Sequence, residues 1–384
     1  MRRRIAIVTG TRAEYGLLLP VIRRVRADPG LKLQLLVTGS HLSRAHGMTV
    51  REIERDGLPI AARVDLRLSG DDARATADAL ARGVSGFARA FARLRPDVLV
   101  VLGDRYEILA AAAAALPFGL PVAHIHGGES SEGVWDESVR HAVTKLSHLH
   151  FPAAPLYARR LALMGENPRR IVCAGSPGWD RIREIRTMSR AELEKDLGLS
   201  LRRPLVAATF HPATLEADRG LAQCRALLSA LDRLGGVVVF SYPNADAGGG
   251  AIKREILAYV RRHPSRAVAV PSLGQRRYFS LLRHADAMAG NSSSGLLEAP
   301  FFRLPVVNLG ERQKGRLRGS GVLDVPRPTA SNVLAALRRA ISPAFRRRLP
   351  APPPVRRSPS ETIVRVLKTV ELNSELLKKS FHGL

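Results

Sequence analysis

The chain gathers ionisable side chains in one stretch that runs from His124 to Lys145. Within it, His126-Gly127-Gly128-Glu129 follows a short apolar run, and the glycine pair lets the backbone turn beside a ligand. Asp136, Arg140 and His141 come next, at spacings that place them near one face of a helix. Carboxylates and imidazoles held close together shift one another's pKa toward neutrality, as general acid and base catalysis requires. The pattern therefore predicts proton-transfer chemistry.

A metal ion is the competing interpretation for His124, His126 and Glu129. The two histidines would share a face only if the strand continued through both, and no HExxH spacing on a helix is present. The two cysteines, Cys173 and Cys224, lie far apart, so neither a cysteine metal site nor a disulfide framework is expected. We expect no metal.

A second charged segment, Gly103-Asp104-Arg105, follows the apolar run from Val98 to Leu102. It places a carboxylate and a guanidinium together where a strand should end, beside a glycine that permits close backbone approach. The alternative interpretation is that Asp104 caps a helix and that Arg105 is solvated.

Residues 290–295 read Gly-Asn-Ser-Ser-Ser-Gly and precede a helical pattern from Leu296 to Phe301. Hydroxyls and free backbone N–H groups at a helix N-terminus form an anion site, for which a diphosphate is the natural occupant. Glu298, one turn into that helix, suits either hydrogen bonds from ribose hydroxyls or a favourable interaction with the helix dipole. A flexible serine-rich turn is the simpler alternative.

Two further segments suit phosphate contact. The segment from Asn308 to Arg316 places three cations, Arg312, Lys314 and Arg316, after another apolar run. His211 follows the run that ends at Thr209, where it suits phosphate contact or proton transfer, although a single histidine is often only structural.

All of these segments follow short apolar runs that alternate with helical patterns. The runs that predict strands are Ile5 to Thr9, Leu33 to Val37, Val98 to Leu102, Val122 to Ile125, Leu205 to Thr209, Val237 to Phe240, Ala267 to Val270, Ala285 to Ala289 and Val306 to Leu309. Such alternation predicts an α/β fold with parallel sheets covered on both faces. Ligands then lie beyond the carboxyl ends of the strands.

A chain of 384 residues, 45% of them apolar, is long enough for two domains that each bury a core. We expect an N-terminal domain over residues 1–178, a second domain over 179–359, and a last helix, Ser360 to Leu377, within 360–384 that returns to the first domain. Residues 346–359 are rich in proline and arginine and predict a linker.

Neither a signal peptide nor a membrane span is expected. The run from Ile5 to Val8 is too short for a signal peptide, and the apolar stretch 108–125 contains two prolines and a histidine. The cytoplasm is therefore the expected location. The 60 basic residues exceed the 34 acidic ones by 26, but they are scattered and lack aromatic interleaving, which favours an arginine-rich surface over a nucleic-acid site.

Six segments in this order resemble the hydrolysing UDP-N-acetylglucosamine 2-epimerases of sialic and legionaminic acid pathways. They are residues 10–15 (Gly-Thr-Arg-Ala-Glu-Tyr), 103–105, 124–129, 136–145, 290–300 and 308–316. The resemblance spans nearly the whole chain. It implies two Rossmann-like domains facing a cleft, an architecture similar to that of GT-B glycosyltransferases, with no nicotinamide or metal requirement, and a dimer or tetramer.

By the matching motifs, the residues that look like UDP-binding positions are Arg12, Arg105, Asn244, Ser292, Ser293, Glu298 and Arg312. His211 is similar to a histidine near the phosphates. Asp104 and Asp136 look like catalytic carboxylates, and Glu137, Arg140 and His141 belong to the same block. Some members of the family have glutamate where this chain has His126, which can still serve as an acid or a base.

The implied reaction begins with cleavage of the anomeric C1–O bond and removal of the C2 proton. UDP leaves, water adds to the resulting glycal at C1, and a proton returns to C2 on the opposite face. Asp104, His126 and Asp136 are the candidates for the two proton transfers. The expected substrate is UDP-N-acetylglucosamine, giving N-acetylmannosamine. A UDP-2,4-diacetamido-2,4,6-trideoxy sugar, a glycosyltransferase and a non-catalytic nucleotide-binding module are the alternatives.

Overall fold

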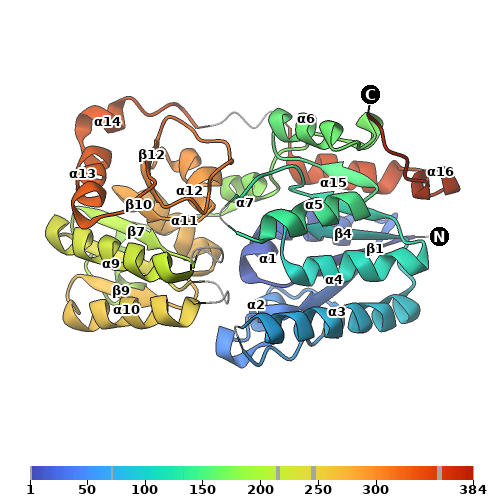
Figure 1. Ribbon diagram of the computed structural model, residues 1–384, viewed down its shortest axis with the longest axis horizontal. Helices are drawn as coiled ribbons and strands as arrows, with labels where there is room; N and C mark the ends of the chain where they lie inside the picture. The colour runs from blue at the N-terminus through green and yellow to red at the C-terminus, as the bar shows by residue number, and fades with distance from the viewer. Residues whose placement is uncertain are drawn as a thin grey trace. The chain divides into compact units, whose positions relative to one another are not determined.

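The computed structural model describes residues 2–70, 72–132, 134–212, 217–243, 248–352 and 357–383. The chain divides into two compact units (Figure 1). Unit 1 comprises Met1–Glu129, Asp136–Arg183 and Val355–Leu384, and unit 2 comprises Ser130–Trp135 and Glu184–Pro354. Each unit is therefore built from segments that are distant in the sequence.

Unit 1 contains a six-stranded sheet in the order β3-β2-β1-β4-β5-β6, and every neighbouring pair is parallel. The strands are β1 (Arg3–Thr9), β2 (Leu31–Thr38), β3 (Ile60–Val64), β4 (Val98–Leu102), β5 (Val122–Ile125) and β6 (Leu149–Phe151). The helices are α1 (Arg12–Ala27), α2 (Val50–Arg55), α3 (Ala73–Leu94), α4 (Tyr106–Ala115), α5 (Asp136–Leu146), α6 (Pro155–Leu163), α7 (Gly178–Glu184), α15 (Pro359–Thr369) and α16 (Ser374–Leu377).

The apolar strands of unit 1 serve two cores, one on each face of the sheet. In β1, Ile5 and Ile7 belong to the core that includes residues of α1 and α15, whereas Ala6 and Val8 belong to the core under α3, α4 and α5. Successive side chains of a strand point to opposite faces, so a continuous apolar run is what a doubly covered parallel strand requires.

Unit 2 has a second parallel sheet in the order β12-β11-β10-β7-β8-β9. Its strands are β7 (Leu205–Thr209), β8 (Val237–Ser241), β9 (Ala267–Val270), β10 (Ala287–Gly290), β11 (Val306–Leu309) and β12 (Val322–Val325). Its helices are α8 (Arg190–Leu197), α9 (Ala217–Leu234), α10 (Gly249–Arg262), α11 (Gly274–His284), α12 (Ser294–Leu297), α13 (Ala330–Ile341) and α14 (Pro343–Arg347). The expectation of two Rossmann-like α/β domains with parallel sheets is confirmed.

Two local expectations were wrong. The last helix does not run unbroken from Ser360 to Leu377: α15 ends at Thr369, and Asn373 caps the separate α16 by accepting a hydrogen bond from the Leu376 N–H at 2.9 Å. The helical pattern from Leu296 to Phe301 is likewise divided into α12 and a 3₁₀ turn, Ala299–Phe302. Pro300 has no N–H to donate, so an α-helix cannot continue through it.

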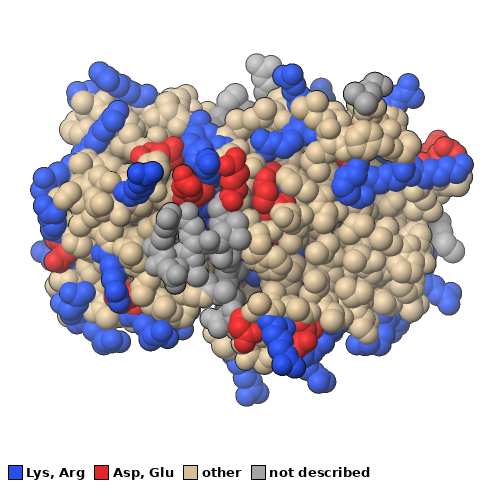
Figure 2. Space-filling view, in the orientation of Figure 1, with Lys and Arg blue, Asp and Glu red and all other residues tan. Residues whose placement is uncertain are grey.

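Basic side chains are spread over the visible face of both units rather than gathered in a single stripe (Figure 2). Within the described ranges, no helix is both long and apolar enough to cross a membrane.

The start of α15 depends on one buried carboxylate. Asp180 Oδ2 accepts hydrogen bonds from Ser360 N at 2.8 Å, Ser360 Oγ at 2.6 Å and Ser358 Oγ at 2.7 Å. Asp180→Ala should therefore lower the stability of unit 1 by about 2 kcal/mol, because the donors lose a charged acceptor at a helix N-terminus.

Urea unfolding and hydrogen exchange of the α15 amides would measure this loss. The exposed Asp78→Ala is the control and should change stability by less than about 0.5 kcal/mol. Unchanged exchange in α15 of the Asp180 variant would contradict the role of this carboxylate.

Candidate active site

The centre of the candidate site in unit 1 is Arg140, whose side chain is only 1% exposed. Its Nη1 donates to Glu137 Oε2 at 2.6 Å and to the backbone oxygen of Glu129 at 3.1 Å, and its Nη2 donates to Asp104. Burial opposes the positive charge, but Asp104, Glu129 and Glu137 outweigh it and raise the pKa of Arg140 above its ordinary value. One guanidinium thus joins the ends of β4 and β5 to the first turns of α5.

The remaining residues of α5 extend this ion pair toward the surface. Glu137 also lies 3.1 Å from His141 Nε2, through its second carboxylate oxygen. His141 and Asp136 are half-buried, and Asp136 is the first residue of the helix. The structure therefore brings Asp104, Glu137, Arg140 and His141 into one connected group.

His126 lies immediately after β5 and has a backbone φ of 67°, a left-handed conformation that is uncommon for residues other than glycine. Its Nδ1 is 3.0 Å from Glu129 Oε1, and its Nε2 is 3.1 Å from Ser176 Oγ. All three residues are at most 5% exposed. A carboxylate on one ring nitrogen fixes the orientation of an imidazole, which is the arrangement that general acid and base catalysis uses.

His124 has a different role from His126. Its Nε2 donates to the backbone oxygen of Gly103 at 2.7 Å, and its Nδ1 accepts from Thr144 Oγ1 at 3.2 Å. Burial lowers its pKa to about 3, so the ring is neutral and bridges the Asp104 loop to α5. Both nitrogens are engaged, which argues against metal binding by His124. Across the part of the chain that the structure describes, no group of three His, Cys, Asp or Glu side chains is arranged to hold a metal.

Arg105 and Arg12 lie near the start of α4 and α1. The Arg105 Nε contacts both carboxylate oxygens of Glu107, at 3.3 and 3.2 Å, and Glu107 is 1% exposed. Arg12 begins α1, directly after its N-cap Thr11. The guanidinium of Arg105 is therefore partly neutralised within the protein, which the sequence pattern did not indicate.

Glu14 is buried in the first turn of α1, at the third position after the N-cap Thr11. Its Oε2 accepts from the Gly10 N–H at 2.7 Å and from the Thr11 N–H at 3.2 Å. Burial raises its pKa to about 8; Glu107 adds to the rise, whereas Arg105 opposes it. Glu14 is thus a carboxyl that retains its proton at neutral pH.

Asn291 organises the candidate anion loop of unit 2. Its Oδ1 accepts from the His211 N–H at 2.7 Å, and its Nδ2 donates to the His211 backbone oxygen at 2.8 Å. Its own backbone oxygen accepts from Gln313 Nε2 at 2.8 Å and Arg312 Nη1 at 3.2 Å. The loops after β7, β10 and β11, which are neighbours in the sheet, are joined in this way.

Gly290, at the end of β10, allows this close approach. It has a φ of 135°, and a Cβ at this position would lie 1.8 Å from the backbone oxygen of Thr209. No other residue fits there. Ser292 and Ser293 follow and are half-buried, with Ser292 Oγ 3.4 Å from the Ser294 N–H. Because α12 has only four residues, the hydroxyls and N–H groups of this loop matter more for anion binding than the expected helix dipole.

Glu298 is the C-cap residue of α12 and not part of its first turn, so the interpretation as a favourable charge at the N-terminus of the helix was wrong. It accepts a hydrogen bond from Ser294 Oγ, which also pairs with Tyr278 Oη. Burial raises the pKa of Glu298 to about 7, and the Ser294 hydrogen bond opposes the rise.

Two of the three expected phosphate-binding cations have partners in the segment Ser130–Trp135. Lys314 Nζ lies 3.1 Å from Glu132 Oε2, and Arg316 Nε donates to Ser131 Oγ at 3.2 Å. Arg312 instead contacts the Asn291 loop, so it is the strongest phosphate-binding candidate of the three. Asn244 lies outside the described residues.

Sequence reasoning missed several residues of these groups. Glu107 carried a signal, since it is the one acidic residue in an alanine-rich apolar helix. Ser176 and Tyr278 carried none, because their partners are distant in the sequence. Asn291 stood within a motif, but nothing in the motif indicates a contact with His211.

The chain matches the family model described as UDP-N-acetylglucosamine 2-epimerase over residues 23–368. It is 38% identical over 324 residues to a Campylobacter jejuni GDP/UDP-N,N'-diacetylbacillosamine 2-epimerase (hydrolyzing), covering 84% of each chain. It is 36% identical over 386 residues to a Legionella pneumophila UDP-N,N'-diacetylbacillosamine 2-epimerase (hydrolyzing), covering 99% of each. A Neisseria meningitidis UDP-N-acetylglucosamine 2-epimerase is 33% identical over 340 residues, covering 88% of each.

Among solved structures, the fold is similar to that of a Neisseria meningitidis UDP-GlcNAc 2-epimerase bound to UDP-GlcNAc, with a TM-score of 0.76 and 16% identity over 95% of this chain and 99% of that one. It is also similar to S. aureus MnaA in a co-structure with UDP, with a TM-score of 0.77 and 19% identity over 96% of each chain. At these identities the likeness concerns the fold alone.

We predict that Arg140→Gln destabilises unit 1 by about 3 kcal/mol, because it removes the buried cation that pairs with the half-buried carboxylates of Asp104 and Glu137. Urea unfolding would measure the loss. The exposed Arg159→Gln removes the same charge from α6 and should be nearly neutral. Equal stability of the two variants would show that the buried ion pairs contribute little.

Glu14 should make stability fall as the pH rises from about 5 to 8. The unfolded chain releases this proton near the ordinary pKa of 4.5, whereas the folded protein retains it until about 8, so raising the pH favours unfolding. Glu14→Gln keeps an acceptor for the Gly10 and Thr11 N–H groups but cannot titrate. Its melting temperature should therefore decline less steeply with pH than that of the unmodified protein, and identical slopes would contradict the assignment.

Proposed function

The chain belongs to the UDP-N-acetylglucosamine 2-epimerase family, and we propose from this that it is a hydrolysing 2-epimerase, which converts a UDP-linked 2-acetamido sugar to UDP and the free 2-epimer. The observation that carries the proposal is the group of acid and base side chains at the carboxyl ends of β4 and β5. Asp104 is held there by Arg140, and His126 is held by Glu129 and Ser176.

The proposed first half-reaction is an elimination. A base removes the proton from C2, the electrons of the C–H bond form the C1=C2 double bond, and the bond from C1 to the phosphate oxygen breaks. UDP leaves with the electron pair of that bond, and a glycal remains. Asp104, His126 and Asp136 are the candidate bases, and Arg140 and Glu129 act by orienting the first two.

The second half-reaction is an addition of water. The water oxygen bonds to C1, its proton passes to a base, and an acid delivers a proton to C2 on the face opposite to the one that lost it. The sum is one water consumed and one UDP released. His126 suits a role in proton delivery because its ring is buried between a carboxylate and a hydroxyl, and an imidazole both gives and accepts protons near neutral pH.

We propose that unit 2 provides most of the UDP-binding site. The Asn291 loop supplies the Ser292 and Ser293 hydroxyls, and Arg312 beside it offers a guanidinium to a diphosphate. His211, fixed by Asn291, is the proposed neighbour of the phosphates. We further propose that Glu298 binds the ribose hydroxyls and that Arg12, Arg105 and Asn244 contact the nucleotide. Hydrogen-bond donors that are already in position before the reaction stabilise the departing phosphate, because the protein does not have to rearrange as charge develops.

We favour UDP-N,N'-diacetylbacillosamine, a 2,4-diacetamido-2,4,6-trideoxy sugar nucleotide, as the substrate. The relatives at 38% and 36% identity carry this sugar in their names, and the second of them covers 99% of the chain. UDP-N-acetylglucosamine, which would give N-acetylmannosamine, is the second candidate because a relative at 33% identity is named for it.

Incubating the purified chain with each sugar nucleotide in D₂O tests the proposal. We expect release of UDP together with one deuterium at C2 of the free sugar, detected by NMR. A faster reaction with one of the two nucleotides identifies the sugar. Release of UDP without deuterium at C2 would indicate a glycosyltransferase or a simple hydrolase, and absence of UDP release from both would overturn the proposal.

Asp104→Asn should lower kcat by roughly a hundredfold or more, as expected for the loss of an acid–base group. The exposed Asp78→Asn in α3 removes the same charge from unit 1 and should leave kcat unchanged. Equal activity of the two variants would show that Asp104 takes no part in the reaction.

A further inference from the structure

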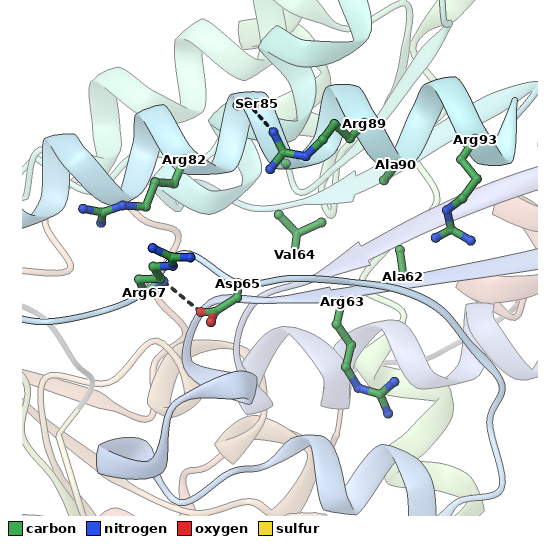
Figure 3. Close-up of a pocket in the computed structure, with 11 residues that line it drawn as sticks. Ala62, Arg63, Val64, Asp65, Arg67, Arg82, Ser85, Arg89, Ala90 and Arg93 are labelled. Carbon is green, nitrogen blue, oxygen red and sulfur yellow. Dashed lines mark hydrogen bonds between the residues drawn. The ribbon is translucent and has the colours of Figure 1, made fainter.

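Unit 1 has a hollow of about 650 Å³ between strand β3 and helix α3 (Figure 3). Five of the eleven residues that line it are arginines. They are Arg63, Arg67, Arg82, Arg89 and Arg93. No residue of the proposed reaction lies in this hollow, and two strands, β2 and β1, separate β3 from β4 in the sheet.

Small residues form the floor of the hollow. Ala62 and Val64 come from β3, and Gly86 and Ala90 come from α3. A Cβ on Gly86 would lie 2.6 Å from Val64 Cγ1, so the helix can approach the strand this closely only with glycine there. The close packing leaves an apolar floor beneath the longer side chains of the rim.

The rim on the α3 side is a single stripe of arginines. Arg82, Arg89 and Arg93 are spaced i, i+7 and i+11, which returns to nearly the same face of a helix and spans about 16 Å along its axis. In Figure 3, Arg67 faces this stripe from the segment after β3, whereas the Arg63 side chain extends from β3 away from α3.

The positive charge of the rim is only partly balanced. Arg63 pairs with Glu54 at 2.8 Å, and Arg82 lies 3.9 Å from Asp78. Arg67, Arg89 and Arg93 form no ion pair with any carboxylate in the described ranges. The one acidic residue in the lining, Asp65, accepts a hydrogen bond from the Arg67 backbone N–H at 2.8 Å.

The guanidinium groups are nevertheless held in place. Arg93 Nη2 donates to the backbone oxygen of Ala61 at 3.0 Å, and Arg82 Nη1 donates to that of Leu66 at 3.3 Å. Arg89 Nη1 donates to Ser85 Oγ at 2.7 Å. Each guanidinium has five N–H donors, so most of them stay available to a ligand. Fixing the donors in advance reduces the entropy lost on binding.

We propose that this hollow, the arginine groove, binds a phosphoanion with at least two charged phosphate groups. Planar guanidinium groups bind phosphate oxygens with two parallel hydrogen bonds, and the volume falls within the range of about 300–1,000 Å³ typical of small-molecule sites. The apolar floor gives an organic part of the ligand, such as a nucleoside, a surface on which to pack. The alternative role for these arginines is to shield the open edge of β3 from pairing with another strand.

Isothermal titration calorimetry on the full chain tests the proposal, with inorganic pyrophosphate and ADP as probes. Every protein titrated also carries Arg312→Ala, which weakens the proposed nucleotide site of unit 2, because added UDP would itself be a ligand for the groove. We expect binding of one equivalent that weakens by about tenfold or more in Arg89→Ala/Arg93→Ala, because charge-assisted hydrogen bonds are lost. Tighter binding of ADP than of pyrophosphate would identify a nucleotide as the ligand, and equal binding would identify the phosphate chain alone.

Arg159→Ala/Arg365→Ala is the matched control, since it removes two exposed arginines from elsewhere in unit 1. It should leave the affinity within about twofold, as for surface charges away from a site. Binding of neither probe, or equal weakening in both double variants, would overturn the proposal and leave edge protection as the role of the groove. The test needs no turnover, so its failure is distinct from failure of the proposed epimerase reaction.

Discussion

The buried guanidinium of Arg140 is the interaction on which the candidate site of unit 1 depends. It connects a carboxylate after β4, a backbone oxygen after β5 and a carboxylate in the first turn of α5. β4 and β5 are paired in the sheet, but the side chains after them and the first turn of α5 are brought together by this guanidinium. Removing a charge from water is costly unless several partners surround it, so the arrangement stabilises only one placement of Asp104 relative to α5. Neutral His124 supports the same placement through its hydrogen bonds to Gly103 and Thr144.

Unit 2 follows a different physical rule. The amide side chain of Asn291 joins the loops of this unit by neutral hydrogen bonds. At Gly290 the backbones of two strands also approach closely, because glycine has no Cβ to meet Thr209. Such a frame adds no negative charge of its own beside the Ser292 and Ser293 hydroxyls, which suits an anionic ligand. The two units thus present complementary chemistry: carboxylates and imidazoles in the first, anion-binding donors in the second.

The sequence predicted the parallel α/β organisation and the segments that follow the strands, because both depend on local patterns of apolar residues. It did not predict β3, which Arg63 interrupts, β12, which Asp324 interrupts, or β6, whose three residues are too few to show a pattern. It also did not predict the division of the helix at Pro300. The apolar spacing of residues 296–301 favours one continuous helix, whereas Pro300 opposes it. The pairing of Ser176 with His126 could not have been predicted, since the two residues are 50 positions apart and meet only through tertiary packing.

The discontinuous construction of unit 1 has a consequence for synthesis of the protein on the ribosome. Ile363, Val364 and Leu367 of α15 complete the core over β1 and α1, yet they are translated after the whole stretch Glu184–Pro354 of unit 2. At about 5–20 residues per second, that interval lasts on the order of ten seconds or more. During it, the part of this core that α15 covers stays exposed, and such apolar surface is what chaperones recognise and what drives aggregation of nascent chains.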